Sequence, residues 1–163
     1  MVRNAHGIFH TWKKEISMPT THSSLHVHVI FSTKERAPLL TTDLIDDAHA
    51  YIGGILRELD CKPVAVGGVA DHVHILVGTK PVHRLSDVMR ETKKVSSIWM
   101  NARCRGFAWQ EGYGAFAVSN HEVPMMMQYV SHQAEHHKSK SFLEEMEQVY
   151  RLAGVSFYPS EFE

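Results

Sequence analysis

The sequence predicts an α+β protein of the ferredoxin-like class: a βαββαβ order that builds an antiparallel sheet with helices on one face, followed by C-terminal helices. Three observations predict this class. Short segments rich in β-branched and apolar residues indicate four strands. Longer segments with apolar residues at helical spacing indicate helices between and after them. The length of 163 residues is that of one domain and suffices to bury a core without disulfide bonds.

The pattern begins with a strand, a loop and a helix. Residues 24–33 (SLHVHVIFST) are mostly β-branched or apolar and predict the first strand. Residues 34–38 are charged and end in Pro38, which indicates a loop. Residues 43–59 repeat apolar side chains every three or four positions and predict the first helix. Three aspartates in its first turn suit the positive end of the helix dipole.

The second half of the sheet follows directly. Residues 62–69 and 71–78 predict two strands joined by a tight connection. Residues 84–103 predict a second long helix, and residues 115–118 a short fourth strand. In a ferredoxin-like sheet the first and third strands form the central pair, so we expect residues 24–33 and 71–78 to lie side by side.

Two more helices follow the sheet. Residues 123–137 predict one, with Pro124 in its first turn, where the missing N–H does no harm. Residues 141–153 predict another, ended by Gly154. These helices, or a ligand, are expected to cover the open sheet face. We expect residues 1–20 to be a flexible leader and residues 21–163 to form a single domain.

The charge is unevenly distributed along the chain. The net charge is −1, but residues 1–105 hold 14 Lys and Arg against 10 Asp and Glu, whereas residues 106–163 hold 3 against 8. A phosphate-binding surface would therefore draw mainly on the first two thirds of the chain. The alternative is ordinary scatter of charge on a soluble surface, and the charge balance alone does not decide between the two.

Composition and motifs exclude several classes. Two cysteines, Cys61 and Cys104, are too few for a disulfide framework, which predicts a reducing, cytoplasmic setting. No apolar run reaches the roughly 18 residues of a membrane span, so we expect no membrane association. The sequence has no GxxxxGK[ST] loop, and we therefore expect no nucleotide cofactor.

The sequence Asp71-His72-Val73-His74 is the first candidate for chemistry. Strand alternation places His72 and His74 on one face, about 6.6 Å apart, where two imidazoles can bind one divalent cation. Structural histidines are the alternative, and the HxH spacing alone is a weak signal. His26 and His28 share this spacing in the first strand, which leaves open a histidine-only zinc site.

Tyr129 and Gln133 form the second candidate. They lie four residues apart in a predicted helix and therefore share one face. A tyrosine hydroxyl can attack phosphorus and form a phosphotyrosine link, and a glutamine oxygen can bind the same metal. The alternative is that Tyr129 is a core aromatic on a methionine-rich helix. Tyr113, between two glycines, is a rival nucleophile, although a role in shaping that turn is favoured.

Several blocks of the chain together resemble one known family, the single-tyrosine HUH transposases of small insertion sequences, which include the REP-associated tyrosine transposases. HUH stands for His, hydrophobe, His, which is His72-Val73-His74 here. The matching blocks occur in the family's order and span roughly residues 24–155. They are HVIFSTKER (28–36), DHVHILV (71–77), Lys93 with Ser96-Ser97, WQEGYGAFAVS (109–119) and YVSHQAEHH (129–137).

The resemblance implies a mechanism and a set of residues. It implies that Tyr129 is the nucleophile, and that His72, His74 and Gln133 bind Mg²⁺ or Mn²⁺. Mn²⁺ suits histidine ligands better than Mg²⁺ does. It further implies a homodimer that recognises DNA hairpins and cleaves and rejoins single-stranded DNA through a 5′-phosphotyrosine intermediate. Two departures, Lys94 and Ala117, stand where the family usually has glycine and serine.

Single-stranded DNA binding requires basic side chains and stacking surfaces. The candidates are Lys34, Arg36, Arg90, Lys93, Lys94, Arg103 and Arg105. Each one could instead be a solvated surface charge.

The sequence is also compatible with two other functions. A non-catalytic nucleic-acid-binding protein of the same fold would present exposed aromatics on its first and third strands, where Phe31 is the main candidate. A zinc hydrolase would use the four histidines of those strands, with Asp71 as the nearest carboxylate.

Overall fold

The computed structural model describes residues 22–159, and the predicted leader, residues 1–20, lies outside them. The strands are β1 (Leu25–Ser32), β2 (Lys62–Val69), β3 (His72–Thr79) and β4 (Gly114–Val118). The helices are η1 (Lys34–Arg36), α1 (Ile45–Glu58), α2 (Leu85–Asn101), α3 (Val123–Ser131), α4 (Gln133–His136) and α5 (Phe142–Ala153). No helix within the described residues is long and apolar enough to cross a membrane.

The four strands form one antiparallel sheet in the order β2-β3-β1-β4. The predicted ferredoxin-like order and its central pair, β1 beside β3, are confirmed. The register sets Ile30 opposite His74 and Ser32 opposite His72. The end of β1 therefore lies beside the start of β3, where the HxH motif stands.

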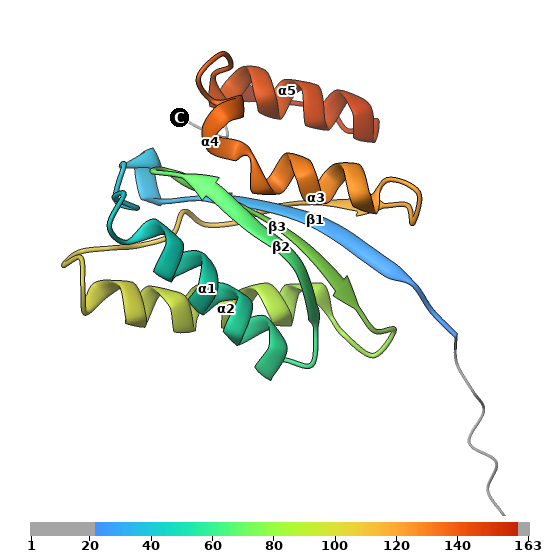
Figure 1. The fold of residues 1–163 in the computed structure, drawn as a ribbon, viewed down its shortest axis with the longest axis horizontal. Helices are drawn as coiled ribbons and strands as arrows, with labels where there is room; N and C mark the ends of the chain where they lie inside the picture. Colours follow the sequence, from blue (N-terminus) through green and yellow to red (C-terminus); the bar gives the residue numbers. More distant parts are fainter. Residues whose placement is uncertain (1–21, 160–163) are drawn as a thin grey trace, which may run out of the picture.

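Helices cover both faces of this sheet (Figure 1). The lower face in that view packs against α1 and α2 through the main core, to which β1 and β3 contribute Val29, Phe31, Val73 and Ile75. The α3, α4 and α5 helices lie over the opposite face (Figure 1). Strand alternation thus sends Val73, Ile75 and Val77 of β3 into the main core, and His72 and His74 toward the C-terminal helices.

Two small apolar clusters attach the C-terminal helices to the sheet. Ile30 of β1 packs with Phe142 and Met146 of α5. Leu76 of β3 packs with Val130 of α3. The histidines of β3 lie in the sheet face between these two clusters, so the packing of α3 and α5 encloses them.

The structure differs from the sequence prediction in two elements. Residues 34–36, predicted as loop, form the short helix η1, in which Glu35 and Arg36 have positive φ angles of 54° and 52°. The helix predicted over residues 123–137 is interrupted at His132, whose φ of −110° and ψ of 26° are not helical. The His132 backbone N–H instead bonds the carbonyls of Gln128 and Tyr129, which closes the last turn of α3.

The sequence contains recognisable signals for both the start and the end of α5. Ser141 and Glu144 form a capping box at the start of α5. Gly154 ends it in the left-handed conformation, as predicted, with a φ of 68°. These signals place Phe142, Glu145 and Met146 on the face of α5 that is buried against the sheet.

Candidate metal centre and nucleophile

His72 and His74 lie on the same face of β3, as the strand pattern predicts, and both side chains are almost fully buried. Their ring centroids are 5.1 Å apart. Val73, between them, is buried in the main core on the other face of the sheet. The two imidazoles therefore occupy a shielded position beneath α3–α5 rather than an open sheet surface.

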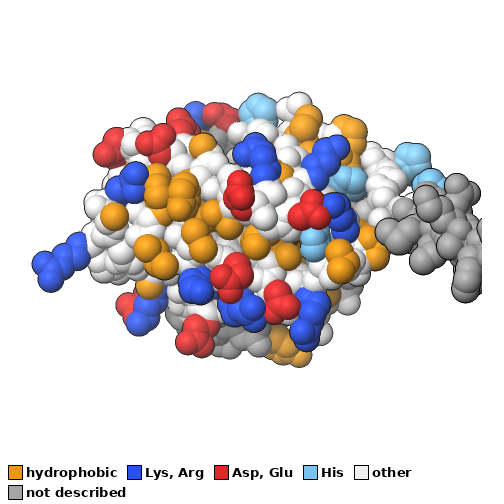
Figure 2. Space-filling model, turned by 90° about the horizontal axis from the view of Figure 1, so that it is seen from below, with side chains coloured by type: hydrophobic (Ala, Val, Ile, Leu, Met, Phe, Trp, Pro, Cys, Tyr) orange, Lys and Arg blue, Asp and Glu red, His pale blue; other side chains and the backbone are white. Residues whose placement is uncertain are grey.

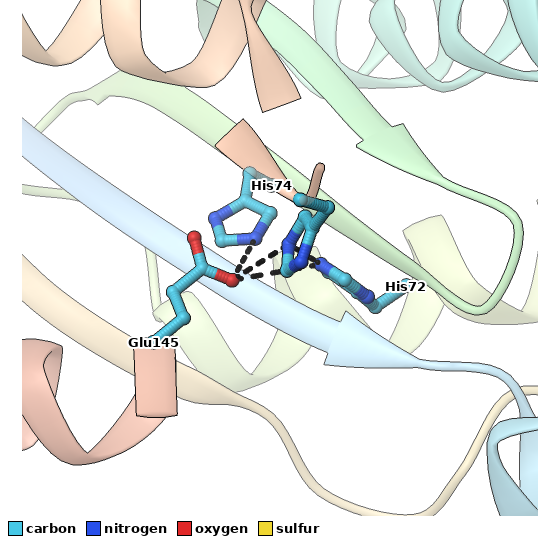
Figure 3. Close-up of side chains that lie close together, drawn as sticks. His72, His74 and Glu145 are labelled. Atoms are coloured by element: carbon cyan, nitrogen blue, oxygen red, sulfur yellow. Dashed lines mark hydrogen bonds and ion pairs between the residues drawn. The ribbon is translucent and has the colours of Figure 1, made fainter. Parts of the chain in front are cut away.

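Two side chains from the C-terminal segment join this pair. The Glu145 carboxylate oxygen Oε2 lies 3.7 Å from His72 Nε2, 3.6 Å from His74 Nε2 and 2.9 Å from His137 Nε2. Glu145 projects from α5 toward the histidines of β3 (Figure 3). Together the four residues form a group whose ligand atoms all lie within 4.8 Å of one another.

Tyr129 reaches the same group from α3. Its hydroxyl donates a hydrogen bond to Glu145 Oε1, and its ring packs edge-on against those of His74 and His28, with centroids 5.7 Å and 5.9 Å apart. Burial and the adjacent Glu145 charge raise the pKa of the phenol well above its usual value. In this arrangement the Tyr129 hydroxyl is therefore protonated.

Gln133 is buried beside Tyr129. Its side-chain Nε2 donates to the Tyr129 backbone carbonyl at 3.3 Å. Gln133 Oε1 has no hydrogen-bond partner within the described residues. The helix break at His132 thus leaves the predicted pair of Tyr129 and Gln133 in contact, and one amide oxygen stays available as a ligand.

The Asp71 carboxylate contacts His72, and the Arg36 guanidinium contacts that carboxylate. His72 Nδ1 lies 2.7 Å from Asp71 Oδ1, and Arg36 donates to Asp71 Oδ2 at 2.8 Å. Burial alone would raise the pKa of Asp71, but the bonds from His72 and Arg36 outweigh it and lower that pKa to about 2. A charged Asp71 fixes the proton of His72 on Nδ1 and leaves Nε2 free to bind a cation.

His28 supports His74 in a similar way. His28 Nε2 lies 3.0 Å from His74 Nδ1, and the two rings are stacked. Burial lowers the pKa of His28 to about 3 and that of His74 to about 4, the latter against the attraction of Glu145. Both rings are therefore neutral, the form that binds metal.

His26 does not join the group. It pairs with Gly78, four residues along β3 from His74. Within the described residues the group that could hold a metal ion contains neither His26 nor His28. The structure thus does not assemble the four histidines of the zinc hydrolase alternative.

The cluster fits a bound cation. His74 Nε2 and Glu145 Oε2 are buried and have no hydrogen-bond partner within the described residues. Buried polar atoms are normally paired, because an unpaired one loses its hydration without compensation. Imidazole nitrogens and a carboxylate oxygen are common ligands of divalent transition metals.

The sequence prediction did not include His137 and Glu145, although it contained a signal for each. His137 belongs to the YVSHQAEHH block, at its last position. Glu145 lies at helical spacing between Phe142 and Val149, on the otherwise apolar face of α5. A carboxylate on an apolar helix face requires a buried partner, and here the partners come from the HxH strand.

The basic residues predicted to bind DNA fall into two groups. Those on and after α2, except Lys93, lie across the sheet from the cluster, on a face where basic and acidic side chains alternate (Figure 2). Arg90 pairs with Asp87, Lys94 pairs with Glu91, and the Arg103 guanidinium stacks 3.7 Å from the Trp99 ring centroid. Arg105 is exposed beyond the end of α2.

The other group lies beside the candidate centre. Lys34 is exposed in η1, and Arg36 reaches Asp71 and the Phe142 ring. Lys93 donates to the backbone carbonyls of Gln110 and Gly112 at 2.5 Å and 2.6 Å. Arg36, Gln110 and Gly112 line a cavity of about 260 Å³ together with Phe142, whose ring contacts that of His72.

Two tyrosines were candidates for the nucleophile, and only one lies in the cluster. Tyr113 lines the cavity next to η1, in the loop before β4. Tyr129 lines a different cavity of about 360 Å³, between α3, β4 and α5, which Glu145 and His28 also line. This geometry supports Tyr129 over Tyr113 as the reactive phenol.

The binding-module alternative requires aromatics on an open sheet face. That face is covered by α3, α4 and α5 (Figure 1). Phe31, the main candidate, faces the opposite way and packs against Trp109 in the main core. Its ring is therefore not available to stack on a base.

The chain is similar to known transposases in sequence and in fold. The family model described as "Transposase IS200 like" matches residues 21–133. A crystal structure of a candidate transposase from Deinococcus radiodurans R1 is 25% identical, with a TM-score of 0.58, over 69% of this chain and 93% of that one. A REP-associated tyrosine transposase bound to a REP hairpin has the same fold at 18% identity, with a TM-score of 0.51, over 69% and 70% of the two chains. No curated protein matches.

Proposed function

The chain belongs to the IS200-like transposase family, and from this membership we propose that it cleaves and rejoins single-stranded DNA through a 5′-phosphotyrosine link at Tyr129. The observation that carries the proposal is the hydrogen bond from the Tyr129 hydroxyl into the His72, His74 and Glu145 cluster. A phenol beside a set of possible metal ligands is an arrangement that suits metal-assisted cleavage by a tyrosine nucleophile.

The cleavage step conserves the number of phosphoester bonds. The Tyr129 oxygen forms a bond to phosphorus, and the bond from phosphorus to the 3′ oxygen breaks. The phenol proton passes to the Glu145 carboxylate, which already accepts its hydrogen bond, and the leaving 3′ oxygen takes a proton from water. In the reverse step a 3′-hydroxyl attacks the phosphotyrosine, so rejoining requires no nucleotide cofactor.

His72, His74 and Gln133 would hold the divalent cation, Mg²⁺ or Mn²⁺, while DNA is bound. Once bound, the cation supplies positive charge beside the phosphate oxygens and beside the phenol. The available oxygen of Gln133 and the unpartnered Nε2 of His74 support this assignment. The charged Asp71 would keep His72 in the correct tautomer.

The substrate we propose is a DNA hairpin with a single-stranded flank. A transposase with the same fold is bound to a REP hairpin in its solved structure. Lys34 and Arg36 beside the centre would contact the backbone at the cleavage site. Lys93 would contact the substrate near the centre, and the other residues on and after α2 (Arg90, Lys94, Arg103 and Arg105) would contact more distant parts of it. We propose a homodimer, because exchange of strands requires two cleavages and each chain offers one such tyrosine.

The test is a cleavage assay on a single-stranded oligonucleotide that carries a hairpin, with Mn²⁺ or Mg²⁺. We expect a covalent adduct between the protein and the 5′ end of one product. Tyr129→Phe should abolish the adduct and retain DNA binding, because only the nucleophilic oxygen is lost. Tyr113→Phe is the matched control and should still form the adduct.

Two outcomes would contradict the proposal. An adduct formed by Tyr129→Phe would show that another residue is the nucleophile. Hairpin binding by the native chain without any adduct, under all metal conditions, would instead favour a non-catalytic binding protein. His72→Ala should lose cleavage and keep its fold, since its role is in metal binding, and circular dichroism would check the fold.

A further inference from the structure

We propose that His137 and Glu145 complete a four-ligand transition-metal centre with His72 and His74 in the DNA-free protein, an inference that rests on the proposed function. The ion would be a borderline cation of the Zn²⁺ or Co²⁺ class rather than Mg²⁺. Glu145 would then bind the ion through Oε2 while its Oε1 holds the Tyr129 hydroxyl. The resting centre would thus include two ligands beyond the HxH motif and Gln133.

The distances match a four-coordinate centre. A tetrahedral zinc ion with bond lengths of 2.0–2.1 Å sets neighbouring ligand atoms about 3.3 Å apart. Glu145 Oε2 lies 3.7, 3.6 and 2.9 Å from the Nε2 atoms of His72, His74 and His137. His72 Nε2 lies 3.0 Å from His137 Nε2. The longest separation in the group stays within 4.8 Å, so small side-chain movements would close it around one ion.

The tautomers leave three lone pairs facing the centre. His72 Nδ1 is next to the Asp71 carboxylate, and His137 Nδ1 is 3.0 Å from the Lys140 carbonyl oxygen. Both partners can only accept, so each ring carries its proton on Nδ1. The two Nε2 lone pairs then face each other at 3.0 Å, which is repulsive unless a cation or a proton lies between them. His74 Nε2 is the third such atom, since His28 engages its Nδ1.

Burial strengthens the need for a cation. Glu145 is only 1% exposed, and its Oε2 has no hydrogen-bond partner within the described residues. A buried carboxylate is stable only when it is paired or bound to metal. One divalent ion at the meeting point of the three Nε2 atoms would pair this charge and separate the facing lone pairs. No other residue has to move into the cluster.

The chemical types of the four ligand atoms determine which divalent ion the site would prefer. Three imidazole nitrogens and one carboxylate oxygen suit zinc and the neighbouring divalent metals. Mg²⁺ prefers an octahedron of oxygens and keeps several waters, which this buried site does not offer. A centre with four protein ligands is also closed, in agreement with the almost complete burial of His72 and His74. DNA would have to displace Glu145 or His137 before a phosphate oxygen could bind.

The test is metal binding by the full chain without DNA, followed by the visible absorption of bound Co²⁺. We expect one ion per chain with the intense absorption of a four-coordinate site, displaced by Zn²⁺ but not by an equal concentration of Mg²⁺. Glu145→Gln and His137→Gln should each lower the Co²⁺ affinity at least tenfold and change the spectrum. The matched controls are Glu147→Gln and His132→Gln, two exposed positions of the same segment.

The outcomes separate this inference from the proposed function. Native Co²⁺ affinity in both Glu145→Gln and His137→Gln would overturn the inference and leave the cleavage proposal intact. Native binding by His72→Ala and His74→Ala would overturn both. If Glu145→Gln does not fold, Glu145→Asp keeps the charge and shortens the reach. Unchanged Co²⁺ affinity in that variant would contradict the ligand role of Glu145.

Discussion

Asp71 illustrates how one side chain sets the chemistry of its neighbour. Its carboxylate bonds His72 Nδ1 on one side and the Arg36 guanidinium on the other. Arg36 reaches it from a backbone with positive φ at two successive residues, a conformation that costs about 1–3 kcal/mol at each. Such strain persists where the surrounding structure requires it. Arg36 would therefore support the proposed metal centre through Asp71, in addition to its proposed contact with DNA.

The first prediction concerns this carboxylate. Asp71→Asn keeps the size of the side chain but removes the charge that orients His72 and attracts its proton to Nδ1. We expect the affinity for Mn²⁺ to fall tenfold to a hundredfold, the usual effect of losing such a support. Isothermal titration of the DNA-free chain with Mn²⁺ measures it.

The control for Asp71→Asn is Asp87→Asn, which removes an exposed carboxylate that pairs with Arg90. Its Mn²⁺ affinity should equal that of the native chain. Equal losses in both variants would indicate a general electrostatic effect, and no loss in Asp71→Asn would show that His72 is held by other contacts.

At the scale of elements, the approach of α3 to β2 sets the position of Tyr129, the proposed nucleophile. Gly67 of β2 pairs with His74 of β3 and faces the backbone of Val130 in α3. A Cβ atom at Gly67 would collide with the Val130 carbonyl oxygen. Only glycine therefore lets α3 lie close enough for Tyr129, the residue before Val130, to reach the histidines.

The second prediction tests this approach. Gly67→Ala should push α3 away from the sheet and lower the free energy of unfolding by about 1–3 kcal/mol, the usual cost of overpacking. The yield of the protein–DNA adduct should fall further than the loss of folded protein explains, because Tyr129 moves with α3. Urea denaturation and the cleavage assay measure the two effects.

Gly54→Ala is the control for this change. Gly54 lies inside α1, and a Cβ atom there would meet nothing within 4 Å. Alanine should raise the free energy of unfolding by up to about 1 kcal/mol through its helix propensity and leave the adduct yield unchanged. If Gly67→Ala behaves like Gly54→Ala, then α3 does not lie as close to β2 as the structure has it.

At the scale of the whole molecule, one chain brings together the phenol and the metal ligands. His72 and His74 come from β3, Tyr129 from α3, and Glu145 from α5 of the same chain. The covering of the sheet by these C-terminal helices is what closes the site. Each subunit of a dimer would therefore carry its own nucleophile beside its own histidines.

The third prediction follows from this arrangement. A mixture of Tyr129→Phe and His72→Ala chains, combined so that mixed dimers form, should produce no protein–DNA adduct. No subunit in such a dimer contains both a phenol and a complete histidine pair. Adduct formation by the mixture would show that the tyrosine helix of one subunit serves the partner's histidines. Mixtures of each variant with the native chain should form the adduct and serve as controls.

The sequence by itself determined the elements and their order. Segments rich in β-branched and apolar residues marked the strands, helical spacing marked α1 and α2, and Gly154 marked the end of α5. Strand alternation put His72 and His74 on one face and Val73 on the other. These features depend on neighbours close along the chain, and local periodicity therefore contains the information.

Only the tertiary structure decided the partners of those residues. Glu145 and His137 follow His72 by about 65–73 residues in the chain. They lie next to the HxH motif because the C-terminal segment folds back over the sheet. The pairing of Arg36 with Asp71 and the contact of Gly67 with α3 arise in the same way. Such contacts follow from the packing of distant elements against a shared surface, and no local pattern in the sequence records which side chains meet there.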